Sequence, residues 1–182
     1  GCNRNEVEQN VGINAVERFL GDTALERGWA LPVPGASSGR RVLVVGSGPA
    51  GLSAAYHLRQ LGHEVTVREA AAEPGGMMRY GIPAYRLPRE VLAAEIARIE
   101  ATGVAIECGT RVTDLDAVQR EFDAVVLTVG AGVAHHVDIP AGAAAKIVDA
   151  IELLRDVASG GKPMLGRRVA VARLMGQDLR QR

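Results

Sequence analysis

Apolar runs alternate with amphipathic stretches along most of the chain, and this pattern predicts strands that alternate with helices. Residues 42–45 form a continuous Val/Leu run, which is typical of a strand buried on both faces of a parallel sheet. Apolar runs at 65–67, 104–106 and 124–130 predict three more strands, the last of them fully apolar. We therefore expect an α/β fold, a Rossmann-like domain with a parallel sheet, preceded by a short helical segment.

Helices are predicted where apolar residues recur every three or four positions. One begins in the glycine-rich stretch after residue 45, a second runs from Pro88 to about residue 102, a short one starts at Thr113-Asp114, and a last one covers 143–158. The residues expected to face inward are Leu92, Ile96 and Ile99 in the second helix and Ile147, Ile151 and Leu154 in the last. Residues 167–171 resume a strand-like pattern near the end of the chain.

The first 29 residues are also predicted to be helical. Asn14 and Glu17 have the spacing of a capping box, and Gly21-Asp22 is expected to divide the segment into two short helices. A buried apolar stripe is expected on one face, made by Ile13, Val16, Leu20 and Ala24. Residues 30–40 are rich in Pro, Gly and Ser and are expected to form a connector.

Composition restricts the kinds of partner and location. The chain has 182 residues, with 21 basic and 21 acidic side chains, so its balanced charge does not favour nucleic acid or an anionic membrane as a partner. Aromatic residues make up only 3%, which disfavours a surface that stacks on bases. No apolar run approaches the ~20 residues of a membrane span. A cytoplasmic protein is the expectation.

Metal and thiol chemistry has little support in the sequence. The two cysteines, Cys2 and Cys108, are too few for a disulfide framework or, within this chain alone, for a metal or cluster site. Cys108 is expected to be a small buried side chain rather than a reactive thiol. His135-His136 is not predicted to bind a metal, because adjacent residues of a strand point to opposite faces.

The stretch after the first strand has the chemistry of a dinucleotide phosphate loop. Gly46, Gly48 and Gly51 form the G-x-G-x-x-G pattern at the start of a helix, together with Pro49 and Ala50. The first glycine allows a tight turn, the second lets a pyrophosphate approach the backbone, and the third allows close packing of helix on sheet. A pyrophosphate is expected at the helix N-terminus, where unpaired N–H groups and the helix dipole favour an anion.

Glu69 follows the second predicted strand, 18 residues beyond Gly51. A carboxylate at this position accepts hydrogen bonds from the ribose hydroxyls of a dinucleotide. The same carboxylate repels a 2′-phosphate, so the site is expected to suit FAD or NAD rather than NADP. A strand, loop, helix, strand and acid in register are far more specific than the glycine pattern alone.

The long loop at 73–88 has two interpretations. Its Gly75-Gly76 pair is able to bring the backbone against a second part of a dinucleotide, and Arg79 and Arg86 are able to donate to phosphate or flavin oxygens. The alternative is an ordinary turn with two solvated arginines.

Several motifs in one order resemble the small subunit of glutamate synthase and its relatives, including the flavin-containing part of dihydropyrimidine dehydrogenase. The resemblance covers most of residues 2–171. It rests on the following stretches: Cys2-Asn3-Arg4, residues 15–22, the glycine loop with Glu69, Gly75-Gly76, residues 79–83 and Arg86-Leu87-Pro88.

The resemblance implies a flavoprotein oxidoreductase in which NADPH reduces FAD and the electrons leave through iron–sulfur clusters to a partner subunit or domain. It implies that FAD has its pyrophosphate on residues 48–51 and its adenosine ribose on Glu69. Further FAD contacts implied in the same way involve Gly76, Arg86 and the backbone near Val112 and Gly130. The flavin carries the hydride and electron transfer, so no catalytic side chain is expected.

Two departures from this family lead us to expect a truncated form. Cys2 resembles the last ligand of a [4Fe-4S] run, but the other cysteines of that run would precede residue 1. The second glycine loop, for NADPH, is absent after residues 169–171. We expect residues 1–34 to be a helical remnant of an iron–sulfur domain, 35–40 a linker and 41–163 an incomplete FAD-binding domain. Residues 164–182 would form the first strand of a missing NAD(P)H domain and a divergent tail.

The sequence therefore predicts an FAD-dependent oxidoreductase that passes electrons between NAD(P)H, FAD and an iron–sulfur or large catalytic partner subunit, as a fragment with impaired turnover. Whether this chain is itself an enzyme stays open. The alternative is a non-catalytic module that binds FAD or ADP. A single-domain NAD-dependent dehydrogenase is a third interpretation, disfavoured because no residue pair resembles a substrate acid/base couple.

Overall fold

Four parallel strands form the centre of the structure. The computed structural model describes residues 6–7, 11–132, 142 and 146–171. The strands β1 (Arg41–Val45), β2 (Glu64–Arg68), β3 (Ala105–Glu107) and β4 (Ala124–Leu127) lie in the order β3-β2-β1-β4. Every pairing is parallel, with Val44 of β1 beside Val67 of β2 and Val126 of β4. The predicted α/β fold with a parallel, Rossmann-like sheet is confirmed.

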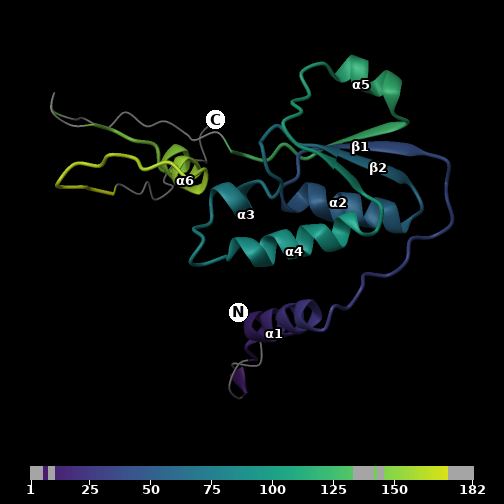
Figure 1. Cartoon of the computed structure of the whole chain (residues 1–182), viewed down its shortest axis with the longest axis horizontal. Helices are drawn as coiled ribbons and strands as arrows, with labels where there is room; N and C mark the ends of the chain where they lie inside the picture. The colour runs from purple at the N-terminus through teal and green to yellow at the C-terminus, as the bar shows by residue number, and fades with distance from the viewer. Residues whose placement is uncertain (1–5, 8–10, 133–141, 143–145, 172–182) are drawn as a thin grey trace.

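Helices cover both faces of this sheet. The helices α2 (Pro49–Gln60) and α4 (Arg89–Glu100) lie on one face, and α5 (Leu115–Glu121) lies over the other (Figure 1). Alternate residues of β1 pack on opposite faces of the sheet, because successive side chains of a strand point in opposite directions. Val44 packs with Ala55 of α2 and Val67, whereas Leu43 and Val45 pack with Val118 of α5. The predicted inward residues Leu92 and Ile96 of α4 are buried, and Ile99 packs beside them.

The N-terminal helix differs from the prediction in three respects. The helix α1 (Ile13–Glu26) is continuous through Gly21, and an Arg18–Asp22 ion pair spans that point at 3.5 Å. Its N-cap is Gly12, without a side-chain hydrogen bond, so the predicted capping box at Asn14 is not formed. The expected buried stripe is wrong as well, since α1 contains no buried residue and Ile13, Val16 and Leu20 are each more than half exposed.

Beyond β4 the described chain has less regular structure than predicted. Strand β4 ends at Leu127 and is only partly buried, because it is an edge strand. The helix α6 (Ala150–Ala158) begins later than residue 143, since the Asp149 carboxylate accepts hydrogen bonds from the N–H groups of Ile151 and Glu152 and so caps the helix there. Residues 167–171 lie outside any strand, and Val169 and Val171 are exposed.

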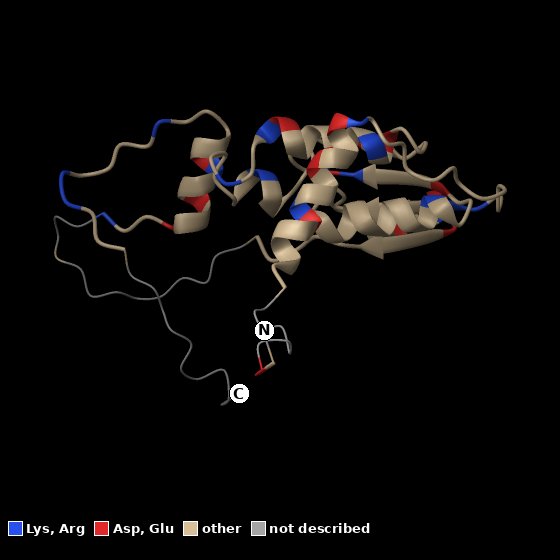
Figure 2. Ribbon diagram, turned by 90° about the horizontal axis from the view of Figure 1, so that it is seen from below, with Lys and Arg blue, Asp and Glu red and all other residues tan. Residues whose placement is uncertain are grey.

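Charges of both signs are interspersed over the described part of the molecule, for example along α4 (Figure 2). Over the same described residues, every helix is too short or too polar to cross a bilayer.

Candidate functional site

The glycine loop turns the chain from β1 into α2 at the carboxyl end of the sheet, where open α/β folds bind ligands. Gly46 has a φ of +103°, and a Cβ there would lie 2.6 Å from the Thr128 carbonyl oxygen. A Cβ on Gly51 would overlap the Gly46 carbonyl oxygen. These two glycines therefore permit the turn and the close approach of α2 that the sequence predicted for them.

Gly48 is placed differently, because a Cβ there would meet nothing within 4 Å. Pro49 occupies the first turn of α2 and has no N–H group to leave unpaired. The backbone N–H groups of Gly48, Ala50 and Gly51 donate to no acceptor among the described residues. The N-terminus of α2 thus presents several N–H donors and the positive end of the helix dipole to open space, which suits a pyrophosphate.

Glu69 lies directly after β2 and is tied to the glycine loop by Ser47. The Ser47 hydroxyl and backbone N–H both donate to Glu69 Oε2, at 2.6 and 2.8 Å, and the Ala71 N–H donates to Oε1 at 2.8 Å. The pKa of Glu69 reflects two opposed influences. Burial raises it, but the hydrogen bonds from Ser47 and Ala71 outweigh burial, and the net pKa lies below the ordinary value. Glu69 is therefore an anion at neutral pH, as a ribose-binding acid must be.

The ionised Glu69 is expected to stabilise the fold above the pKa that it has in the unfolded chain, and this contribution is lost as the pH falls through its lower folded pKa. Thermal unfolding of the wild type and of Glu69→Gln should be compared from about pH 7 down to about pH 3. The variant should unfold at a lower temperature near neutrality, and the difference should shrink in acid. A constant difference would contradict the assignment.

The Gly75-Gly76 pair lies against the glycine loop. The Gly75 N–H points to the Ser47 carbonyl oxygen at 3.1 Å, and a Cβ on Gly76, whose φ is +51°, would lie 2.7 Å from the Gly48 Cα. The short helix α3 (Met77–Tyr80) follows. The loop at 73–88 is thus not an ordinary solvated turn, because its glycines form a wall beside Ser47 and Gly48 of the glycine loop.

The two predicted arginines have different environments. Arg79 is buried, forms an ion pair with Glu73 and donates from Nε to the Pro74 carbonyl oxygen at 2.6 Å. Its side chain therefore holds the loop together. Arg86 is exposed, and its guanidinium has no hydrogen bond or ion pair within the described part of the chain.

The remaining predicted contacts lie around the same edge of the sheet. Val112 packs against the core beside Leu43 and Val45, so only its backbone is suited to a ligand. Gly130 is exposed with a φ of +69° and lies three residues after β4. Cys2 and the pair His135-His136 fall outside the described residues. Among those described, no three His, Cys, Asp or Glu side chains form a group suited to a metal.

Cys108 is exposed, which contradicts its predicted burial in the core. It follows the short strand β3, which lies at the edge of the sheet. Partial desolvation raises the pKa of its thiol, and the negative charges of Glu69 and Glu100 raise it further. The thiol therefore stays protonated at neutral pH, which does not favour a nucleophilic role.

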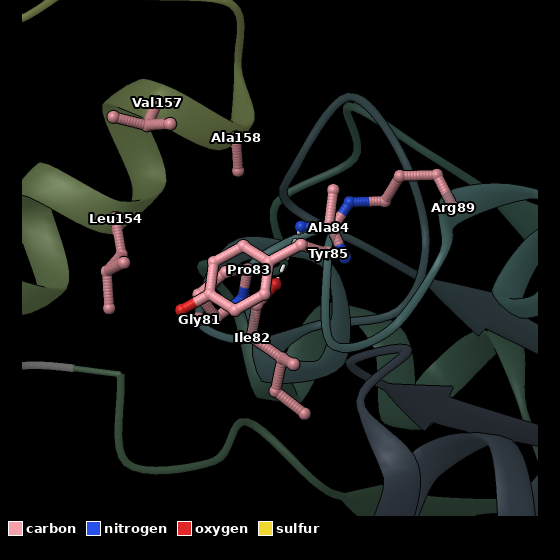
Figure 3. Close-up of a pocket in the computed structure, with 9 residues that line it drawn as sticks. All are labelled: Gly81, Ile82, Pro83, Ala84, Tyr85, Arg89, Leu154, Val157 and Ala158. Atoms are coloured by element: carbon pink, nitrogen blue, oxygen red, sulfur yellow. Dashed lines mark hydrogen bonds between the residues drawn. The ribbon is translucent and has the colours of Figure 1, made fainter.

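A cavity of about 360 Å³ lies beyond the far end of α3 (Figure 3). On one side are Leu154, Val157 and Ala158 of α6, and on the other is the 81–85 segment, which includes the Tyr85 ring. Arg89 braces this segment by donating to the Ile82 carbonyl oxygen at 2.7 Å. The cavity is mostly apolar, and the lining residues 81–85 come shortly after Gly75-Gly76 in the sequence.

Comparison with known proteins agrees with this geometry. Residues 44–125 match the family model of an NAD(P)-binding Rossmann-like domain. The PreT subunit of NAD-dependent dihydropyrimidine dehydrogenase from Escherichia coli (strain K12) is 42% identical over 133 residues, which cover 71% of this chain and 32% of PreT. A putative NADPH glutamate synthase small chain from Cereibacter sphaeroides is 33% identical over 174 residues, covering 88% of this chain and 42% of that one. The chain is a homologue of these oxidoreductase subunits. The resemblance inferred from the motifs is confirmed.

The chain spans only about a third of the length of PreT. Among solved structures, Mycobacterium tuberculosis FprA in complex with NADPH aligns with a TM-score of 0.55 and 19% identity, over 64% of this chain and 28% of FprA. This likeness concerns the fold alone.

Sequence reasoning missed Ser47, the residue that connects the glycine loop, Glu69 and Gly75. Its position inside G-x-G-x-x-G is a variable one, so the pattern assigns it no role. The only signal was a hydroxyl residue flanked by two glycines, beside a strand whose neighbour ends in an acid.

Proposed function

We propose that this chain binds FAD and belongs to an oxidoreductase that passes electrons between NAD(P)H, FAD and an iron–sulfur or large catalytic partner subunit. The observation that carries the proposal is the contact of Gly76 with Gly48. This contact places the start of the 75–88 segment, whose motifs resemble those of the flavin proteins, against the glycine loop. It therefore favours FAD over NAD. The matched family model names NAD(P), but the Rossmann glycine loop serves both NAD and FAD.

Specific residues are proposed to hold the cofactor. The N–H groups of Gly48, Ala50 and Gly51 bind the pyrophosphate, and Glu69 binds the adenosine ribose. Gly75 and Gly76 close the site, Arg79 keeps that loop in place, and Arg86 donates to the flavin. The backbone near Val112 and Gly130 completes the contacts. FAD supplies the hydride and electron transfer, while the chain binds and orients it.

The electron donor and the iron–sulfur acceptor are proposed by analogy with the relatives. The relatives are named as NAD- or NADPH-dependent subunits, which supports NAD(P)H as the reductant. A [4Fe-4S] cluster with Cys2 as one ligand, and the division of the chain at 34, 40 and 163, belong to the same proposal. In this scheme the isolated chain shows little NADPH-dependent dye reduction.

A non-catalytic FAD- or ADP-binding module is the second candidate. An NAD(P)H-binding domain would begin with a strand and a glycine loop near residues 167–171. The described residues there form no strand and no such loop, and Val169 and Val171 are exposed, which favours this candidate. Both candidates predict little or no NADPH-dependent dye reduction by the isolated chain, so robust turnover would contradict both of them.

The test of the proposal is flavin binding. The purified protein is expected to carry a yellow chromophore, or to take it up from added FAD, and Glu69→Ala should weaken FAD binding in calorimetric titration. Glu64→Ala, at the opposite end of β2, is the matched control. Tight NAD binding without FAD affinity would reverse the cofactor assignment.

A further inference from the structure

Ser47 has an unusual environment for a residue of a phosphate loop. Its side chain is fully buried, although the glycines on either side are partly exposed. The hydroxyl has one proton, and the 2.6 Å contact with Glu69 Oε2 uses it. The hydroxyl oxygen then accepts from the Gly75 N–H at 3.2 Å, and this N–H is shared with the Ser47 carbonyl oxygen at 3.1 Å. One hydroxyl therefore connects three segments of the site.

The hydrogen bonds of Glu69 leave its two oxygens unequal. A carboxylate oxygen accepts about two hydrogen bonds. Oε2 already accepts two, both from Ser47, whereas Oε1 accepts one from the Ala71 N–H. The Ala70 N–H also lies near the carboxylate and helps to lower its pKa, without a hydrogen bond of good geometry. The remaining acceptor position is on Oε1.

We infer that Ser47 is a positioning residue of the dinucleotide site: its hydroxyl occupies Glu69 Oε2 and, together with the Ser47 carbonyl oxygen, holds Gly75, so that the cofactor ribose is bound through Oε1 alone. This inference rests on the proposed dinucleotide function. It explains why a buried hydroxyl stands where the turn itself requires only a small residue. It also ties the orientation of the acid to closure of the Gly75-Gly76 wall.

Few other charges act on Glu69. The negative charge of Glu69 raises the pKa of the Cys108 thiol, which follows β3. Glu100 of α4 and Glu73 of the loop also raise the pKa of this thiol, and Arg79 lowers it. Cys108 has a raised pKa and stays neutral in acid. Titration of Glu69 therefore reports mainly on its hydrogen bonds, of which the bond from the Ser47 hydroxyl is the shortest.

Ser47→Ala tests the inference, with Ser53→Ala on the exposed side of α2 as the matched control. The carboxyl carbon of Glu69 is titrated by NMR in the protein without cofactor, and FAD binding is measured by calorimetry at neutral pH. In Ser47→Ala we expect the Glu69 midpoint to rise by about one pH unit and the FAD dissociation constant to rise roughly tenfold. Ser53→Ala should change neither. If Ser47→Ala does not fold, as judged by circular dichroism, Ser47→Cys is used in its place. Its thiol fills the space of the hydroxyl but is a weaker hydrogen-bond donor.

The outcomes are distinguishable. An unchanged Glu69 midpoint overturns the inference whatever happens to FAD. A raised midpoint with unchanged FAD affinity overturns the role toward the ligand. If the wild type itself does not bind FAD, the proposed function fails and takes that role with it, while a raised midpoint would still support the positioning of Glu69 by Ser47.

Discussion

Replacing Gly51 by alanine is expected to lower the midpoint of thermal unfolding by roughly 10 °C or more, which corresponds to about 3 kcal/mol of lost stability. The added methyl group would overlap the Gly46 carbonyl oxygen and lie 2.7 Å from the Thr128 hydroxyl. Neither is the free end of a flexible side chain, since Thr128 is held by hydrogen bonds to the carbonyl oxygens of Val45 and Gly46. The helix α2 must therefore move away from the sheet.

The matched control for this experiment is Gly48→Ala in the same loop. Its methyl group would meet nothing within 4 Å, and the backbone, with φ of −67°, suits an L-residue. Its unfolding temperature should remain close to that of the wild type. Similar unfolding temperatures for Gly51→Ala and Gly48→Ala would mean that α2 is not packed as described.

Replacing Gly48 by valine is expected to abolish FAD binding while the protein stays folded. A branched side chain would fill the open space over the N–H groups of α2 and keep a pyrophosphate from reaching them. The loss of two or three charge-assisted hydrogen bonds should raise the FAD dissociation constant at least about 100-fold. Calorimetry with FAD, together with circular dichroism, separates lost binding from lost fold.

Gly21→Val is a suitable control for the valine substitution, because Gly21 lies in α1 and a Cβ there would meet nothing within 4 Å. It should leave FAD affinity unchanged. Undiminished FAD binding by Gly48→Val would place the pyrophosphate away from the glycine loop.

The strands could be predicted from short, continuous apolar runs, and the helices packed on them from apolar residues that recur every three or four positions. Residues 42–45 had to be buried on both sides, and Leu92 and Ile96 had to face the sheet. The stripe of α1 has the same period, but a periodic pattern does not say whether another surface covers it, and Ile13, Val16 and Leu20 remain exposed. The predicted burial of Cys108 was wrong for a similar reason, because the residue follows the edge strand β3 and an apolar pattern does not show which side chains are covered there.

The glycine loop and Glu69 could be located because each glycine has a separate steric role and the acid follows a strand. How Glu69 is used could not be predicted, since the donors Ser47 and Ala71 meet it only after β1 and β2 have paired. Arg79 shows the same limit. Its sequence position was compatible with a ligand contact, whereas its carboxylate partner Glu73 and the Pro74 carbonyl turn it inward.

The hydrogen bond between Gly75 and Ser47 joins segments that lie far apart in the chain. It joins residues 28 positions apart, and the intervening chain contains all of α2 and β2. Bringing such distant residues together costs loop-closure entropy, and only the crossover and the parallel pairing of β1 with β2 can offset that cost. A nascent chain that ends near residue 62 therefore contains the complete glycine pattern but has no closed site. The contact between Gly75 and Ser47 therefore forms only after the first β-α-β unit is in place.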